Sequence, residues 1–235
     1  MINNRKHLSQ SVTYAFVASC AIVSLLFTAF FLAEPSISYG DDTATFSVHQ
    51  TITDETSFLV NPSNITMVGS ISGITGGNAT GTASFVVQSN NSTGYYVEIA
   101  FFNNGSAEAM SGDVDADESL RDYSGDVAGQ PSYAYVASTS SQFAYTVTSS
   151  TTADTDGSFL SNGANACNTG STSGSGLHCW KAPATSGFRI VDRGSAAVSG
   201  ASSTIQFNVN VPSGATPVPT AQTYTATATL SLFAQ

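Results

Sequence analysis

The sequence predicts an all-β domain: a single antiparallel β-sandwich of about eight strands that follows an N-terminal signal or anchor helix. Three observations lead to this prediction. Apolar and polar residues alternate with a period of two in many short segments, turn-forming residues separate these segments, and no stretch beyond residue 33 has the period of an amphipathic helix. Because an antiparallel strand buries one face and exposes the other, repeated short alternation favours two packed sheets.

The chain begins with a segment typical of exported proteins. Arg5 and Lys6 precede an uncharged, strongly apolar run at residues 13–33. A basic start followed by an apolar core is typical of a signal peptide, and the run also approaches the roughly 20 residues that a membrane-spanning helix needs. Two outcomes are open: cleavage after Gly40 would start the mature chain at Asp41, whereas an uncleaved segment would anchor the domain.

Either outcome places the remaining chain outside the cytoplasm. We therefore predict residues 1–40 as the signal peptide or anchor and residues 41–235 as one extracellular domain, with membrane contact only through residues 13–33 if they are retained. The net charge of −10, with only six Lys and Arg, disfavours nucleic acid as a partner. Charged residues make up 9% of the chain, against about 25% in typical globular proteins, so uncharged residues supply the polar surface.

The strongest alternating segments are expected to form the main strands. These segments are residues 82–88, 95–102, 143–148, 188–191, 204–211 and 223–233. Shorter candidates lie at residues 57–60, 65–68 and 132–137. The turn-forming cluster at residues 89–94 predicts that the two strands beside it pair as a hairpin.

A further alternating segment lies near the start of the predicted mature chain. In residues 44–53, Phe46, Val48 and Ile52 share one face, and the other face is polar. A strand at a free terminus can add to the sheet edge of a neighbouring molecule. We therefore expect residues 41–53, freed by cleavage after Gly40, to act as a donor strand in self-association.

Cys167 and Cys179 are the only cysteines outside the apolar N-terminal run. In an oxidising compartment we expect them to form a disulfide. The bridge would restrict the Gly- and Ser-rich loop between them and contribute about 2–3 kcal/mol in the chain-entropy model. The alternative is a metal site formed by Cys167, His178 and Cys179, which has two adjacent ligands and no clear fourth one. We predict no cofactor.

An acidic stretch raises the question of calcium binding. Its candidate ligands are Asp113, Asp115, Asp117 and Glu118. Alternate carboxylates suit a hard cation, but an EF-hand loop needs glycine where Glu118 stands and a bidentate acid where Ser124 stands. A calcium site and a solvated acidic loop are the two interpretations.

Aromatic residues suggest a second kind of site. Trp180, Tyr133 and Tyr135 are candidates for contact with a sugar ring, and packing within the core or a loop is the alternative for Trp180. Catalysis has less support, because the chain lacks a Gly-x-Ser-x-Gly motif and offers only His49 and His178 as a base beyond the apolar run. We predict that the protein is not an enzyme.

Several segments resemble those of known bacterial surface proteins. Residues 82–87, 93–97, 109–112 and 223–230 are similar in type and order to segments of secreted spore-coat-U-like and pilin-like proteins and of WxL domains. The resemblance implies an immunoglobulin-like or pilin-like sandwich in a structural or adhesive protein of the cell surface, with self-association or other surface partners. The alternative, indicated by Tyr and Trp residues in an uncharged polar surface, is a module that binds cell-wall polysaccharide or peptidoglycan.

Overall fold

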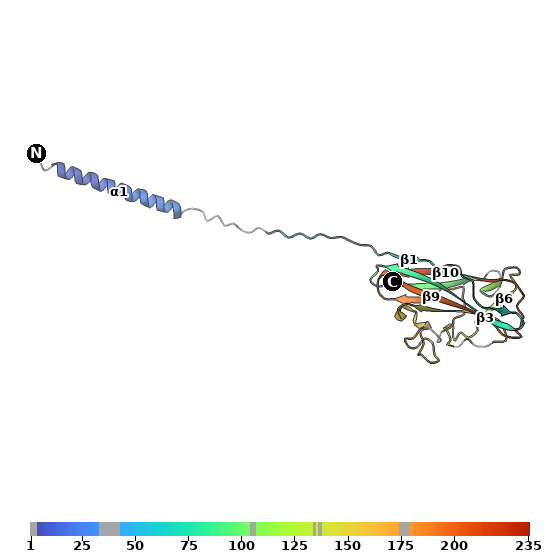
Figure 1. Ribbon diagram of the computed structural model, residues 1–235. Helices are drawn as coiled ribbons and strands as arrows, with labels where there is room; N and C mark the ends of the chain where they lie inside the picture. The colour runs from blue at the N-terminus through green and yellow to red at the C-terminus, as the bar shows by residue number, and fades with distance from the viewer. Residues whose placement is uncertain (1–3, 33–42, 104–106, 134, 136–137, 174–178) are drawn as a thin grey trace. The chain divides into compact units, whose positions relative to one another are not determined.

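The computed structural model describes residues 4–32, 43–103, 107–133, 135, 138–173 and 179–235, and the chain divides into two units, Met1–Thr51 and Ile52–Gln235. The first unit contains helix α1 (Asn4–Leu32), and the second contains the strands (Figure 1). Within the described residues, Val12–Leu32 is the one helical segment long and apolar enough to cross a membrane, a property that signal sequences share. The predicted cleavage site at residues 38–40 lies outside the described residues.

The described residues of the second unit form ten strands and two short 3-10 helices. The strands are β1 (Thr56–Val60), β2 (Ile71–Ser72), β3 (Gly76–Ser89), β4 (Tyr95–Phe102), β5 (Met110–Gly112), β6 (Ser119–Asp122), β7 (Gln142–Ser149), β8 (Phe188–Arg193), β9 (Ala197–Val211) and β10 (Tyr224–Ala234). The 3-10 helices are η1 (Thr152–Asp154) and η2 (Gly157–Phe159). The six main strands predicted from alternation all form, but β3 begins at Gly76 and β9 at Ala197, well before the predicted starts at residues 82 and 204.

All ten strands belong to one sheet, in the order β1-β3-β9-β7-β6-β5-β10-β4-β8 with β2 beside β3. The fold is mostly β, as predicted, but it is mixed rather than purely antiparallel, because β6 and β7 run parallel. The prediction of about eight strands was also too low. Strands β2, β5 and β6 have two to four residues each, which is too short for alternation to be recognised.

The predicted hairpin between β3 and β4 is wrong. β3 pairs with β1 and β9, whereas β4 pairs with β10 and β8. The turn between them carries the chain from one part of the sheet to another. Gly94 has a φ of +93° there, and a Cβ on it would lie 1.7 Å from the Arg193 carbonyl oxygen, so this turn requires glycine.

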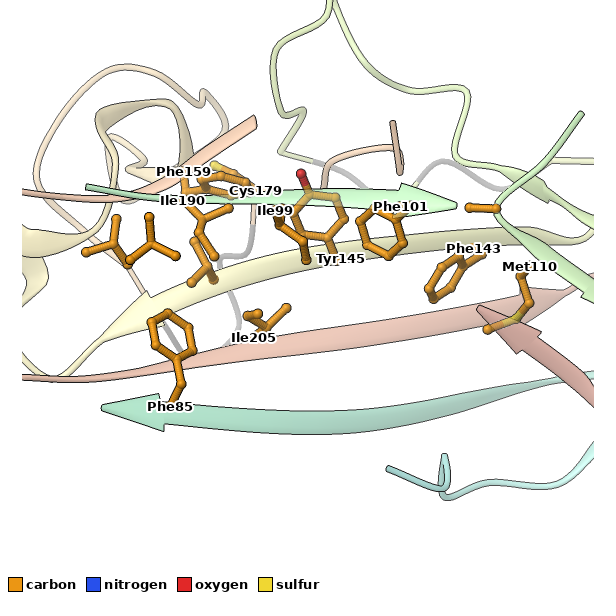
Figure 2. Packing of buried hydrophobic residues seen from close by; sticks show 14 of the residues in the cluster. Phe85, Ile99, Phe101, Met110, Phe143, Tyr145, Phe159, Cys179, Ile190 and Ile205 are labelled. Atoms are coloured by element: carbon orange, nitrogen blue, oxygen red, sulfur yellow. The ribbon is translucent and has the colours of Figure 1, made fainter. Parts of the chain in front are cut away.

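A single buried cluster joins distant parts of the sheet. It includes side chains from β3, β7 and β9 together with side chains from β4 and β8. Figure 2 shows Phe85 and Ile205 on one side of this interior and Ile99 and Phe101 on the other. Full burial of one such side chain contributes about 1.5–3 kcal/mol. The alternating segments therefore meet through their apolar faces, which explains why β3 and β4 can share a core without pairing.

Three predicted strands do not form. Residues 44–53 have no regular secondary structure, and residues 65–68 and the described part of 132–137 contribute only isolated bridges. Residues 134 and 136–137 lie outside the described residues. Alternation specifies which face of a segment is apolar, but a strand also needs a partner edge of matching register.

Replacing Phe85 by alanine tests the shared core. Phe85 is 0% exposed and its ring meets that of Phe58 edge-on at 5.9 Å between centroids. We expect Phe85→Ala to lower the free energy of unfolding by about 3–5 kcal/mol, measured by urea denaturation. Val198→Ala, on an exposed side chain of β9, is the control and should change it by less than about 0.5 kcal/mol. Equal losses would contradict this assignment of the core.

Candidate functional site

Strand β10 is hydrogen-bonded along one edge. It pairs antiparallel with β5 through its first three residues and with β4 through the remaining eight, so β5 and β4 follow one another along the same strand. Just beyond its start, the Asp113 N–H donates to the Thr223 carbonyl oxygen at 2.9 Å, and just beyond its end the Gln235 N–H donates to that of Gly94 at 3.1 Å. The backbone N–H and C=O groups of successive residues in a strand point to opposite edges. The odd-numbered residues from Thr223 to Gln235 therefore direct these groups toward β5 and β4.

The even-numbered residues of β10 therefore direct their N–H and C=O groups to the opposite edge. No strand in the described part of the chain pairs with that edge. β1 lies beside β10 (Figure 1) but hydrogen-bonds to β3. A row of unpaired backbone donors and acceptors is a template for an additional strand.

A groove of about 1040 Å³ runs beside the first half of β10. Residues 65–67, 71–74 and 218–223 form its walls together with β10 itself. Apolar side chains of the main core reach it, and among them the rings of Phe101, Phe143 and Phe207 contact one another with centroids 6.0–6.5 Å apart. The groove thus offers apolar side-chain contacts next to unpaired backbone groups.

The predicted donor segment leaves its apolar residues exposed. Phe46, Val48 and Ile52 are 88%, 84% and 81% exposed. Their segment has no regular secondary structure, and it leads directly to β1, where the Glu55 N–H donates to Asn90 Oδ1 at 2.6 Å. Large apolar side chains that gather on an exposed segment indicate an interaction surface.

The predicted disulfide is confirmed. Cys167 and Cys179 are bonded with an S–S distance of 2.02 Å and a Cα–Cα distance of 5.8 Å, and buried Cys179 belongs to the main core. The bridge therefore fastens the Gly- and Ser-rich loop to the core. His178, the third residue of the alternative metal site, lies outside the described residues. Within the described residues, no three His, Cys, Asp or Glu side chains are grouped so that they could hold a metal ion.

The predicted calcium residues lie in the loop between β5 and β6. These residues are Asp113, Asp115, Asp117 and Glu118. Gln222 organises the loop, because its Oε1 accepts hydrogen bonds from the N–H groups of Val114 at 2.9 Å and Asp115 at 3.1 Å. The three aspartates are exposed, and the described carboxylates form no cation-binding group. Calcium binding at this loop stays a prediction.

Two of the candidate sugar-contact residues take part in a second, smaller core. Trp180 is buried there with Tyr123, and Tyr135 packs against both. The Tyr135 ring stacks on Tyr123 at 5.2 Å between centroids, meets Trp180 edge-on at 5.5 Å, and its hydroxyl donates to the Gln142 carbonyl oxygen at 2.7 Å. Tyr133 is half-buried. Sequence reasoning missed Tyr123, which carries no pattern that distinguishes it from other tyrosines.

Two ion pairs with little solvent exposure were also missed. Lys181 contacts Asp126, and Arg193 Nη1 lies 2.5 Å from Asp154 Oδ2. Lys181 is only 5% exposed, which is rare for lysine unless it is paired. The chain has only six Lys and Arg, and this scarcity is the one sequence signal that draws attention to each of them.

The Asp122 carboxyl lies where the sheet passes from β7 through β6 to β5. Burial raises the pKa of Asp122 to about 6, while the hydrogen bond from the Ala109 N–H and the charge of Lys181 lower it and the charge of Glu108 raises it. The Ala109 N–H lies 3.1 Å from Asp122 Oδ1, and the Asp122 N–H donates to Glu108 Oε2 at 2.7 Å. The ionisation of Asp122 is therefore linked to its hydrogen bonds with Ala109 and Glu108.

Comparison with known proteins assigns no family. No protein-family model matches the chain, and no curated protein matches it. A functional proposal therefore rests on the unpaired edge of β10, the groove beside it, and the exposed segment at residues 44–53.

Replacing Asp122 by asparagine should change how stability depends on pH. The folded protein holds the Asp122 proton up to about pH 6, whereas the carboxyl has a reference pKa of 3.8. The protonated Asp122 carboxyl therefore contributes fully to the free energy of unfolding below about pH 4, and this contribution is lost as the pH rises through about 6. We expect the melting temperature of Asp122→Asn, relative to wild type, to be higher at about pH 7 than at about pH 4.

Asp117→Asn is the matched control for that measurement. It removes one negative charge from an exposed position of the neighbouring loop. A similar pH-dependent difference in the control, or none in Asp122→Asn, would contradict the role of burial at Asp122.

Proposed function

We propose that the protein is exported and displayed outside the cytoplasm, where it acts as a structural or adhesive surface protein. Export is supported by the apolar helix α1 (Asn4–Leu32), and an oxidising environment is supported by the disulfide between Cys167 and Cys179. The low content of charged residues and the polar surface of Ser, Thr, Asn and Gly accord with this location.

The finer architecture belongs to the same proposal. We interpret the sheet as folded over into an immunoglobulin-like or pilin-like sandwich, with β3, β9 and β7 opposite β10, β4 and β8. The support is the single buried cluster to which both groups of strands contribute. In such an arrangement β1 and β10 are neighbouring edges, one from each layer.

We propose further that copies of the protein associate by strand addition, with residues 44–53 of one copy lying along β10 of the next. The observation that carries this proposal is the match between two features of one chain. The segment exposes apolar side chains at alternate positions, and β10 has an edge beside an apolar groove with which no strand of the described residues pairs. Added main-chain hydrogen bonds supply affinity, and alternate side chains in the groove supply specificity.

The dimensions of the two features agree. β10 has eleven residues, and the ten residues of the segment 44–53 in extended form cover nearly the same length. The glycan-binding alternative has no comparable support, because Trp180 and Tyr135 pack against each other in the second core.

A charge placed on the apolar face of the segment should abolish self-association. Phe46→Asp would put a carboxylate into an apolar groove, a strongly unfavourable transfer. We expect this variant to be monomeric by light scattering at concentrations at which the wild type forms multimers. Ser47→Asp, one residue along and on the opposite face, is the control and should still assemble. Multimers of Phe46→Asp would contradict the proposed donor.

The acceptor edge has its own variant. Ala228 is an even-numbered residue of β10, so Ala228→Pro removes an N–H from the unpaired edge and leaves the hydrogen bonds to β4 intact. We expect Ala228→Pro to be monomeric alone. A mixture of the two variants should nevertheless form dimers, because Phe46→Asp keeps an intact acceptor edge and Ala228→Pro keeps an intact donor segment. Absence of dimers in the mixture would contradict strand addition.

A further inference from the structure

Lys181 and Asp126 meet at a junction between distant parts of the second unit. Lys181 stands two residues after Cys179, and its backbone pairs with that of Tyr145 in β7 through hydrogen bonds of 2.8 and 3.0 Å. Asp126 lies in the connection that follows β6. The side chains of Lys181 and Asp126 are only 6% and 15% exposed. A lysine and an aspartate that contact each other so far from solvent are unusual in a chain with this few charges.

We propose that Lys181 and Asp126 condense into an intramolecular amide bond that cross-links their side chains. Lys181 Nζ is in direct contact with Asp126 Oδ2. Two reacting groups that the fold holds in contact behave as if they were at very high concentration, because the entropy of bringing them together has already been lost. The proposal is independent of the self-association proposed above.

The reaction balances without any co-reactant. Lys181 Nζ loses two protons and uses its lone pair to form a bond to Asp126 Cγ. The bond between Asp126 Cγ and Oδ2 breaks with its electron pair on oxygen, and Oδ2 takes up the two protons and leaves as water. Nothing is oxidised or reduced, and the product is one amide and one water molecule.

A backbone hydrogen bond is placed to assist this step. The Ala182 N–H donates to Asp126 Oδ1 at 3.0 Å. Oδ1 is the oxygen that stays, and negative charge develops on it when nitrogen adds to Cγ. A fixed N–H donor at that oxygen stabilises the developing charge. The same hydrogen bond persists in the product, where Oδ1 is the carbonyl oxygen of the new amide.

The pair lies beside aromatic side chains, and Lys181 Nζ also donates a hydrogen bond to the Ala182 carbonyl oxygen at 3.3 Å. Lys181 Nζ lies 5.0 Å from the centre of the Phe188 ring, and Tyr145, next to Lys181, is fully buried. Burial, and then the charge of nearby Asp126, raise the pKa of the Tyr145 hydroxyl well above its ordinary value. Exclusion of water protects an amide from hydrolysis and favours the departure of the water that the condensation releases.

The cross-link would secure a part of the fold that has few strands. Asp126 and Lys181 are separated by 55 positions in sequence. Their bond would tie the connection after β6 to the segment that joins the disulfide to β8. With the bridge between Cys167 and Cys179 close by, two covalent links would hold the long β7–β8 connection against the core.

Mass spectrometry of a tryptic digest of the full-length protein tests the proposal. After reduction of the disulfide, an unmodified chain yields separate peptides for residues 122–181 and 182–189, because trypsin cleaves after Lys181. An acylated Lys181 is not cleaved. We therefore expect a single peptide of residues 122–189 that is lighter than its sequence by one water molecule. Cleavage after Lys181 with both peptides at their unmodified masses would overturn the proposal.

Two substitutions sharpen the test. Asp126→Ala should restore cleavage after Lys181, and Asp126→Asn should give the same amide product with loss of ammonia in place of water. Asp192→Ala is the matched control, because Asp192 pairs with Arg189 in an exposed ion pair, and its digest should keep the peptide that lacks one water. Water loss that persists in Asp126→Ala would overturn the assignment to this pair.

Discussion

Burial of alternating apolar side chains in one shared core is the constraint on which the rest of this structure depends. β3 and β9 contribute Phe85 and Ile205, β4 contributes Ile99 and Phe101, and these side chains belong to one cluster although their strands occupy distant places in the sheet. A chain with 9% charged residues has few ion pairs to organise it. The free energy of folding therefore rests mainly on this apolar contact.

The same constraint creates the candidate site. To bury its share of the core, β4 pairs with β10 on one side and β8 on the other, and β5 continues along the edge of β10 that β4 occupies. The opposite edge of β10 has no paired strand in the described chain, and the core opens beside it as a groove. A site suited to an incoming strand is thus a consequence of incomplete coverage of the core.

The connection from β7 to β8 is stabilised differently. Between Ser149 and Phe188 the described chain contains two short 3-10 helices and isolated bridges but no strand. Local covalent and polar contacts hold it instead: the disulfide, the aromatic packing of Trp180 on Tyr135, and the pair of Lys181 and Asp126. Two of the six cations of this chain, Lys181 and Arg193, pair here with carboxylates that have little solvent exposure.

The sequence alone determined the apolar N-terminal helix, the β class, the six main strands and the disulfide. Each follows from a local pattern: a continuous apolar run, alternation with a period of two, or two cysteines beyond the apolar N-terminal run. Only the tertiary structure decided which strands pair, that β6 runs parallel to β7, that residues 44–53 stay unpaired, and that Lys181 meets Asp126. Alternation tells which face of a strand is buried, but partner, direction and register depend on contacts between residues far apart in the chain, and these leave no local pattern.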